Sequence, residues 1–220
     1  MQLAVGPLDL VSRKVDSVND LALVEPALTD DQRADLLARW SEPQRRYHTL
    51  DHLRQVLHSL ELLSQGGVDF DPVPVRLAAW FHDAIYEIPG TDNEARSAEL
   101  ASEMLTGQSL GDEVARLVIV TATHHVRPDD ANAAALCDAD LSILAGSREQ
   151  YTVYRQQVRE EYAAVPDEHF CVGRAAVLQS LLTQDTLFHT DVGLELWEAR
   201  ARDNVTTEIR DLEQLSFSFR

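Results

Sequence analysis

The segment 77–87 constrains the fold of this chain most, because an apolar run there ends in two adjacent polar residues. Its spacing predicts a helix over 73–84 that buries four apolar side chains, Leu77, Ala78, Trp80 and Phe81. The last turn of this helix would carry His82 and Asp83 into the interior. Burying a charged carboxylate beside an imidazole is costly unless something neutralises the charge. A divalent cation is the simplest partner that meets this need.

The composition is that of an ordinary folded chain with a sizeable core. Of 220 residues, 45% are hydrophobic and 25% are charged, which is typical of one globular domain. No apolar run reaches the length of a membrane span, so we expect no membrane association. Residues 1–10 lack a basic stretch followed by a long apolar one, so we expect no signal peptide. Cys137 and Cys171 are too few for a disulfide scaffold, which favours a reducing cytoplasm.

The charge balance argues against a nucleic-acid polymer as partner. The formal net charge is −18, and Lys14 is the single lysine, so nearly all positive charge is arginine. Nucleic-acid-binding surfaces need clustered Lys and Arg. Arginine also suits bidentate contacts with phosphate or carboxylate. An anionic substrate would therefore depend on a metal ion and a few local arginines to overcome the negative field.

Helical periodicity covers nearly the whole chain. Capping residues, glycines and prolines divide it into segments, and we expect helices over 30–40, 49–63, 73–84, 93–105, 111–123, 132–144, 147–163, 166–182 and 195–215. For the first of these, Asp30 or Asp31 is the expected N-cap. No internal repeat or interdomain linker stands out. We therefore expect one all-α domain over 1–220, a helical bundle whose last helices, 147–215, pack on the rest.

Metal-ligand residue types recur at four places in this pattern. They are His48 with His52, His82 with Asp83, His124 with His125, and Asp138 with Asp140. The first pair has the i,i+4 spacing that puts two side chains on one helix face. Each element alone also fits a solvated face or a helix cap. Imidazole and carboxylate ligands suit Mn, Fe, Co, Ni, Zn or Mg, so the residues do not choose the metal.

The order of these elements resembles the HD phosphohydrolase superfamily, named for its His…His-Asp…Asp ligand set. The resemblance covers 46–144 and implies an HD-type helical domain, the expected ligand-bearing core. His52, with Val56 four residues on, is similar to the first ligand. His82 and Asp83 are similar to the central motif, and Asp140 to the closing ligand. The resemblance implies that these four residues hold one divalent cation.

The first motif is also similar to the Tyr-His-Asn-x-x-His element of cyclic-nucleotide phosphodiesterases, with Thr49 in place of the Asn. That likeness implies that His48 is the general acid and that His52 is the metal ligand. The chain is much shorter than a phosphodiesterase catalytic domain, so the likeness concerns the chemistry and not the substrate.

A bacterial subgroup known only as predicted metal-dependent HD phosphohydrolases is more similar. Its marks are Pro-x-Arg-x-Tyr-His, Phe-His-Asp-x-x-Tyr, Asp-Asn-Glu-x-x-Ser-Ala, Arg-x-Glu-Tyr and Ala-Arg-x-Asn. They correspond here to 43–48, 81–86, 92–98, 159–162 and 201–204. These segments span most of the chain.

Together these features predict metal-assisted hydrolysis of a phosphoester in a nucleotide or another small phosphorylated metabolite. His48 would protonate the leaving oxygen, and Asp83 would orient the attacking water as well as bind metal. Glu87 is a candidate acid or water-binding carboxylate, and a plain loop glutamate is the alternative. His125, rather than His124, is our candidate ligand for a second metal ion. The alternative is a histidine that interacts with a helix C-terminus.

Substrate contacts are expected from arginines and one amide. The candidates are Arg46, Arg159, Arg174, Arg202 and Asn204, with Arg45 beside them. For each of the distal arginines, an ion pair between helices is the competing explanation. Two other functions stay open: a dinuclear iron oxygenase, which requires His124 or His125 as a ligand, and a non-catalytic sensor that binds a nucleotide. The sequence leaves a homo-oligomer open.

Overall fold

Helices form all the regular structure in residues 27–218, the part of the chain that this computed structural model describes. The all-α expectation is therefore confirmed for these residues. The expectation of no signal peptide concerns residues 1–10, which lie outside them. No helix within 27–218 combines the length and the apolar character needed to cross a bilayer.

The helices follow one another with short connections. In chain order they are α1 (Asp30–Trp40), α2 (Leu50–Gln65), α3 (Pro72–Phe81), α4 (Asn93–Met104), α5 (Gly111–Thr121), α6 (Ala131–Leu141), the 3-10 turn η2 (Ser142–Ala145), α7 (Arg148–Glu161), α8 (Asp167–Leu182), α9 (Asp191–Gly193), the π-turn η3 (Leu194–Glu198) and α10 (Ala199–Ser218).

Polar side chains fix where several helices begin. Thr29, and not Asp30 or Asp31 as expected, caps α1, because its hydroxyl accepts from the backbone N–H of Gln32. The Gln32 side chain in turn accepts from the Thr29 N–H, which completes a capping box. Thr49 caps α2 by accepting from the Asp51 N–H. This cap sets the start of α2 and places His52 in its first turn.

Most helices begin and end within two residues of the expected positions, and three differ by more. The third ends at Phe81 rather than at 84, and His82 is its C-cap. The sixth ends at Leu141 and continues as η2, where 132–144 was expected as one helix. The last helical segment begins at Asp191 rather than at 195 and passes through a π-turn into α10. These differences lie at helix ends, where boundaries depend on long-range contacts.

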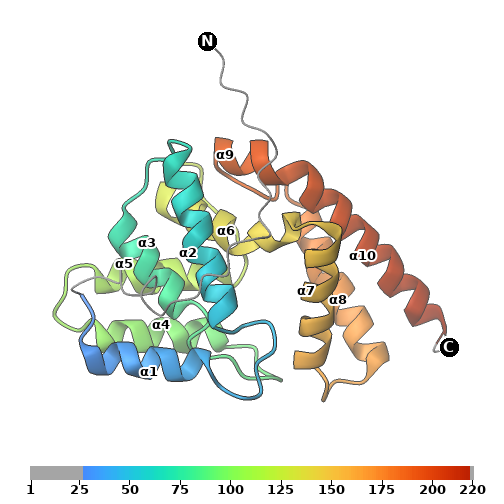
Figure 1. Cartoon of the computed structure of the whole chain (residues 1–220), viewed down its shortest axis with the longest axis horizontal. Coiled ribbons are helices and arrows are strands. Elements are labelled where there is room, and N and C mark those ends of the chain that lie inside the picture. The colour runs from blue at the N-terminus through green and yellow to red at the C-terminus, as the bar shows by residue number, and fades with distance from the viewer. Residues whose placement is uncertain (1–26, 219–220) are drawn as a thin grey trace, which may run out of the picture.

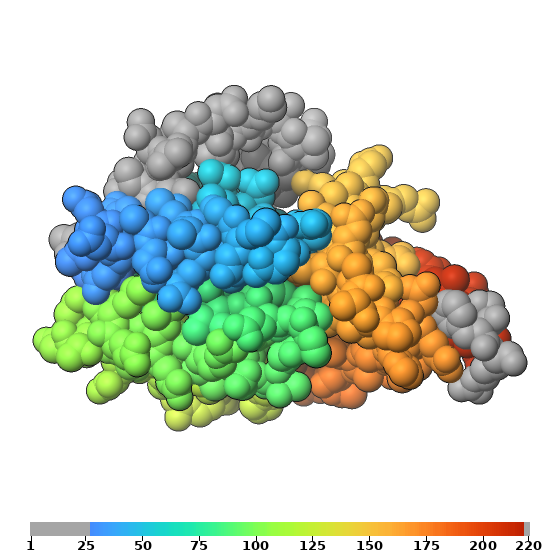
Figure 2. Space-filling view, turned by 90° about the horizontal axis from the view of Figure 1, so that it is seen from below, coloured from blue at the N-terminus to red at the C-terminus, as the bar shows by residue number. Residues whose placement is uncertain are grey.

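The helices form two groups that lie side by side in Figure 1. In one, α2 packs on α3 and α6, while α5 packs on α3, α4 and α6. In the other, α8 packs on α10, and η2 contacts both α7 and α10. Figure 2 shows a face where α1 lies beside the green segment that contains α4, next to the orange end of α7 and α8.

Large side chains fill the centre of the first group. Trp40, Trp80 and Phe81 are fully buried, as the apolar pattern predicts. The indole N–H of Trp40 donates to the carbonyl oxygen of Trp80 over 2.9 Å, which joins α1 to α3. The ring of Trp40 also lies 5.5 Å from that of His82, between centroids. The apolar core thus reaches the residues at the end of α3.

Candidate metal centre

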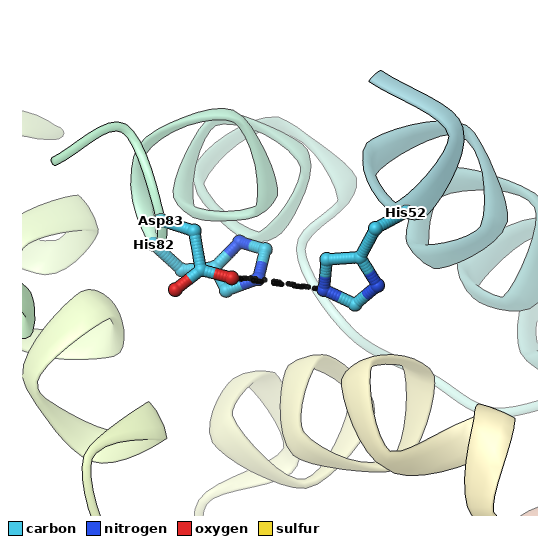
Figure 3. Close-up of side chains that lie close together, drawn as sticks. All are labelled: His52, His82 and Asp83. Carbon is cyan, nitrogen blue, oxygen red and sulfur yellow. Dashed lines mark hydrogen bonds and ion pairs between the residues drawn. The ribbon is translucent and has the colours of Figure 1, made fainter. Parts of the chain in front are cut away.

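Three helices bring their ends together around a small buried polar cluster. His52 lies in the first turn of α2, His82 and Asp83 at the end of α3, and Asp140 in the last turn of α6. His52, His82 and Asp83 are 4%, 1% and 8% exposed. Figure 3 shows the carboxylate of Asp83 and the ring of His82 facing the ring of His52. The sequence placed these four residues apart along the chain, and the fold brings them to one place.

The distances within this cluster suit a single metal ion. His52, His82 and Asp83 each offer a ligand atom, and these atoms lie within 4.8 Å of one another. Nε2 of His52 lies 3.3 Å from Nε2 of His82 and 3.7 Å from Oδ2 of Asp83. His82 Nε2 lies 3.0 Å from that same oxygen. An ion bonded at about 2.0–2.2 Å to each atom would hold neighbouring ligand atoms about 3.0–3.5 Å apart. The His–His–Asp group therefore has the spacing of a metal site.

Asp140 completes the expected set of four. Its Oδ1 lies 3.1 Å from Nε2 of His52 and 3.5 Å from Nε2 of His82. Asp140 thus lies beside the two imidazole nitrogens of the group, and imidazole with carboxylate is a donor set shared by Zn and several other first-row metals.

The outer nitrogen of His82 has a backbone partner that fixes the ring. His82 Nδ1 lies 2.9 Å from the carbonyl oxygen of Ala79, one turn earlier on α3. A carbonyl only accepts, so Nδ1 carries a proton, and Nε2 is left as the atom that can bind a metal ion on the cluster side. This is the outer hydrogen bond that metal-binding histidines usually make.

The electrostatics of the cluster favour a bound cation. Burial opposes a charge on His82, yet Asp83 and Asp140 outweigh it and raise the pKa of His82 well above its usual value. Burial prevails at His52 and lowers its pKa, which keeps that imidazole neutral. Burial also opposes the two carboxylates, but His82 and neighbouring groups hold the pKa of Asp83 and of Asp140 below their usual range. Two charged carboxylates thus face imidazoles in the interior.

The two aspartates of 138–140 have different surroundings. Asp138 is fully buried, and its carboxylate accepts from the backbone N–H groups of His189 and Thr190 and from the Thr190 hydroxyl. Burial raises the pKa of Asp138 to about 6 despite these hydrogen bonds. Gly193 leaves room for it, because an added Cβ would lie 2.4 Å from its Oδ2. Asp138 therefore anchors the start of α9, and Asp140 belongs to the cluster.

A histidine–glutamate pair lies beside the cluster. His48 Nδ1 lies 2.6 Å from Oε2 of Glu161, which comes from the end of α7. Oε1 of Glu161 accepts from the backbone N–H groups of Arg46, Tyr47 and His48. Burial raises the pKa of Glu161, but the contact with His48 outweighs it and lowers that pKa. Sequence reasoning missed Glu161, although it lies inside the Arg-x-Glu-Tyr motif.

His48 is held close to the metal-type residues by ring contacts. Its ring stacks on Tyr86 with 3.9 Å between centroids, and its centroid lies 5.7 Å from that of His52. The His48 side chain is 17% exposed, whereas that of Glu161 is 2% exposed. A partly exposed imidazole backed by a buried carboxylate thus lies in the loop before α2, and not on the same helix face as the candidate ligand His52.

Arg45 holds the His48 loop against the end of α3. Its guanidinium donates to the carbonyl oxygens of Asp83, Ala84 and His48 at 2.7, 3.1 and 3.1 Å. The side chain is fully buried and also pairs with Glu42. The guanidinium satisfies carbonyls that the end of a helix leaves unpaired. Arg45 therefore has a structural place, and not the exposed one that a phosphate contact would need.

The structure reverses our ranking of His124 and His125. His124 has a left-handed backbone, φ 51°, and its Nε2 lies 2.8 Å from Oδ2 of Asp140. His125 is exposed. His124, and not the predicted His125, is therefore the histidine that the fold brings to the cluster. His124 contacts Oδ2 of Asp140, whereas His52 contacts Oδ1.

The other predicted site residues have partners elsewhere. Glu87 is exposed and pairs with Arg96, which lowers the pKa of its carboxyl. Arg46 is exposed and donates to the carbonyl oxygens of Pro43 and of its neighbour Arg45. Both side chains are occupied by local contacts.

The distal candidates bind groups of the protein. Arg159 donates to Asp167 and to two loop carbonyls, and Arg202 to Glu198 and to two more. Asn204 donates to the carbonyl oxygens of 144 and 146. Within residues 27–218, no hydrogen bond or ion pair joins these three side chains to the cluster. The ion pair of Arg159 joins α7 to α8, as the competing explanation had it, whereas Arg202 pairs four residues back along its own helical segment and Asn204 bonds backbone carbonyls.

Comparison of this chain with protein-family models, with curated proteins and with solved structures returned no match. The site is therefore described from its own geometry alone.

Proposed function

We propose that this protein is an HD-type metal-dependent phosphohydrolase that cleaves a phosphoester of a nucleotide or another small phosphorylated metabolite. One observation carries the proposal. The ligand-type atoms of His52, His82 and Asp83 lie within 4.8 Å of one another, and Asp140 Oδ1 lies 3.1 and 3.5 Å from the two imidazole nitrogens. The His48–Glu161 pair beside them supplies the acid that ester cleavage needs.

The donor set fits a divalent cation, which His52, His82, Asp83 and Asp140 would hold. When bound, such a cation lowers the pKa of a coordinated water to about 7 and neutralises phosphate charge. Which of Mn, Fe, Co, Ni, Zn or Mg serves is left to experiment.

The protein's own groups would manage the proton and the orientation. Glu161 accepts a hydrogen bond from the Nδ1–H of His48. This contact stabilises the imidazolium and directs Nε2 outward. His48 then delivers a proton to the leaving oxygen of the ester. Tyr86, stacked on the His48 ring, restricts its rotation. Arg45 keeps the backbone of His48 and Asp83 together while these groups act.

A dinuclear oxygenase is the second candidate, and one contact favours it. His124 Nε2 contacts Oδ2 of Asp140, so His124 and Asp140 together could contribute to holding a second ion. Oxygen consumption by iron-loaded protein, without phosphate release, would support this alternative. Nucleotide binding without turnover would instead support a sensor.

The proposal is tested by metal analysis of the purified protein and a phosphate-release screen across nucleotides, with Mn, Co, Ni, Zn or Mg added singly. The variant is His82→Ala. Its matched control is His58→Ala, because His58 lies on α2 with His52 but is exposed. We expect His82→Ala to lose metal and activity, and His58→Ala to keep both. Full metal content and full activity in His82→Ala would refute the assignment.

A further inference from the structure

The two histidines of the cluster differ in what holds their outer nitrogens. His82 Nδ1 is bonded to the carbonyl oxygen of Ala79. His52 Nδ1 is buried, yet among residues 27–218 it has no hydrogen-bond partner. Buried polar groups are almost always partnered, and metal-binding histidines nearly always use the outer nitrogen. His52 thus lacks the contact that would fix its ring.

A second unpartnered polar atom lies on the neighbouring ring. Tyr47 is 8% exposed, and its hydroxyl is buried without a hydrogen-bond partner in the described part of the chain. The Tyr47 ring packs on that of His52, with 4.8 Å between centroids and a tilt of 41°. Nδ1 of His52 and the hydroxyl of Tyr47, both without a hydrogen-bond partner, therefore belong to side chains in contact.

We propose that the Tyr47 hydroxyl is the outer partner of His52, accepting its Nδ1–H either directly after a small side-chain shift or through one buried water. The proposal rests on the metal site proposed above. When a metal ion holds Nε2 in place of its contact with Asp140, a neutral His52 carries its proton on Nδ1 and must donate. The phenol oxygen can accept. A water enclosed between two such groups meets the minimum of polar partners that buried waters need. Tyr47 is in this view a positioning residue.

The electrostatic surroundings of Tyr47 agree with this place. Burial, followed by Tyr154, Asp140 and Asp83, raises the pKa of the Tyr47 hydroxyl well above its usual value. The hydroxyl therefore stays neutral and within the field of the two cluster carboxylates.

Tyr154 is the competing partner, because its ring lies 4.6 Å from that of Tyr47. Its hydroxyl already accepts from Arg174 over 2.8 Å. If Tyr47 served that network, removing its hydroxyl would affect folding and leave metal binding unchanged. The two roles therefore predict different measurements.

The test compares Tyr47→Phe with Tyr151→Phe in the full chain. Zn²⁺ and Mn²⁺ affinities are measured by calorimetric titration, and the melting temperature is measured on metal-free protein. We expect Tyr47→Phe to bind metal about 10–100-fold more weakly, the usual effect of losing an outer partner. Its metal-free melting temperature should be nearly unchanged, because His52 Nδ1 has a proton to donate to Tyr47 only when the metal ion holds Nε2.

Tyr151→Phe is the matched control with the opposite pattern. The Tyr151 hydroxyl donates to the buried Glu208 over 2.6 Å, far along the chain from the cluster. Its loss should lower the metal-free melting temperature and leave metal affinity unchanged.

Two outcomes for Tyr47→Phe would overturn the inference: unchanged metal affinity, or a fall in melting temperature as large as that of Tyr151→Phe. His52→Ala separates this failure from that of the proposed function. If His52→Ala loses metal while Tyr47→Phe does not, only the positioning role fails. If His52→Ala also keeps its metal, the site itself is wrong.

Discussion

Two buried polar clusters in this molecule are neutralised differently. Between α7, α8 and α10, Glu208 is 2% exposed and binds Arg174 over 3.0 Å and Tyr151 over 2.6 Å. Between α2, α3 and α6, the carboxylates of Asp83 and Asp140 face only imidazoles. No lysine or arginine side chain bonds those two carboxylates within residues 27–218.

The difference shows which cluster is complete. A buried carboxylate costs free energy unless a positive charge and hydrogen bonds accompany it. The first cluster carries its own cation, a guanidinium, and needs nothing further. The second lacks a fixed cation, and a proton on His82 balances it, in whose place the proposed metal ion would act. Polarity and burial alone would not have distinguished a structural cluster from a binding site.

The largest expected effect breaks the complete cluster. Arg174→Met leaves the buried Glu208 with only the more distant guanidinium of Arg155, 4.0 Å away, so the free energy of unfolding should fall by about 3–5 kcal/mol. Urea denaturation of metal-free protein measures it. Because the cluster is purely structural in this view, metal affinity should not change. A loss of metal affinity would show that the two clusters are coupled and that Arg174 serves the site.

Added metal should stabilise the folded protein by binding at the second cluster and not at the first. At a free metal concentration about 100 times the dissociation constant, the free energy of unfolding should rise by about 2.7 kcal/mol. The measurement is thermal or urea unfolding with and without metal after chelation. Asp140→Asn should abolish the gain, because one of the two carboxylates is lost. An equal gain in that variant would place the metal elsewhere.

Removing the carboxylate behind His48 should have a moderate effect. In Glu161→Gln we expect turnover to fall about tenfold, or about 1.4 kcal/mol, because the imidazolium loses its charged partner. Metal content should stay unchanged, since Glu161 touches none of the four ligand-type residues. Phosphate release and metal analysis on the same sample check both. Unchanged turnover would remove His48 from the mechanism.

The same residue gives a pH dependence. Contact with His48 lowers the pKa of Glu161 below its usual 4.5, although burial opposes this. A carboxyl with a lowered pKa in the folded state stabilises the protein above 4.5, and this stabilisation is lost as the pH falls through the lower, folded-state pKa. Wild-type protein should therefore lose stability in acid below about 4.5 more steeply than Glu161→Gln. Parallel melting curves from pH 7 to pH 3 would show it, and identical slopes would contradict it.

The smallest effect on stability and KM is expected from Arg159, which belongs to neither cluster. Arg159 pairs with the exposed Asp167, so Arg159→Ala should change stability by less than about 1 kcal/mol. KM should stay within about twofold of wild type. A large rise in KM would restore Arg159 as a substrate contact.

Local periodicity was sufficient for most of each helix, whereas the set of four ligand-type residues was chosen through the HD resemblance. His82 and Asp83 follow an apolar run in the sequence, and the structure places them, as expected, at the inner end of a helix. It could not find Glu161, because the pairing with His48 spans 113 positions and leaves no periodic trace. The same holds for the end of α3, which depends on Arg45 binding carbonyls from a loop that precedes it. The sequence also could not show which of His124 and His125 faces the cluster, since this depends on the left-handed backbone conformation of His124.

The guanidinium of Arg45 has one more consequence. It bonds the carbonyl oxygens of His48 and Asp83 with the same nitrogen. The loop that carries His48 and the turn that carries Asp83 are therefore held by one side chain, so loosening one loosens the other. A single buried side chain thus couples the positions of two loops, to which the proposed mechanism assigns proton donation and metal binding.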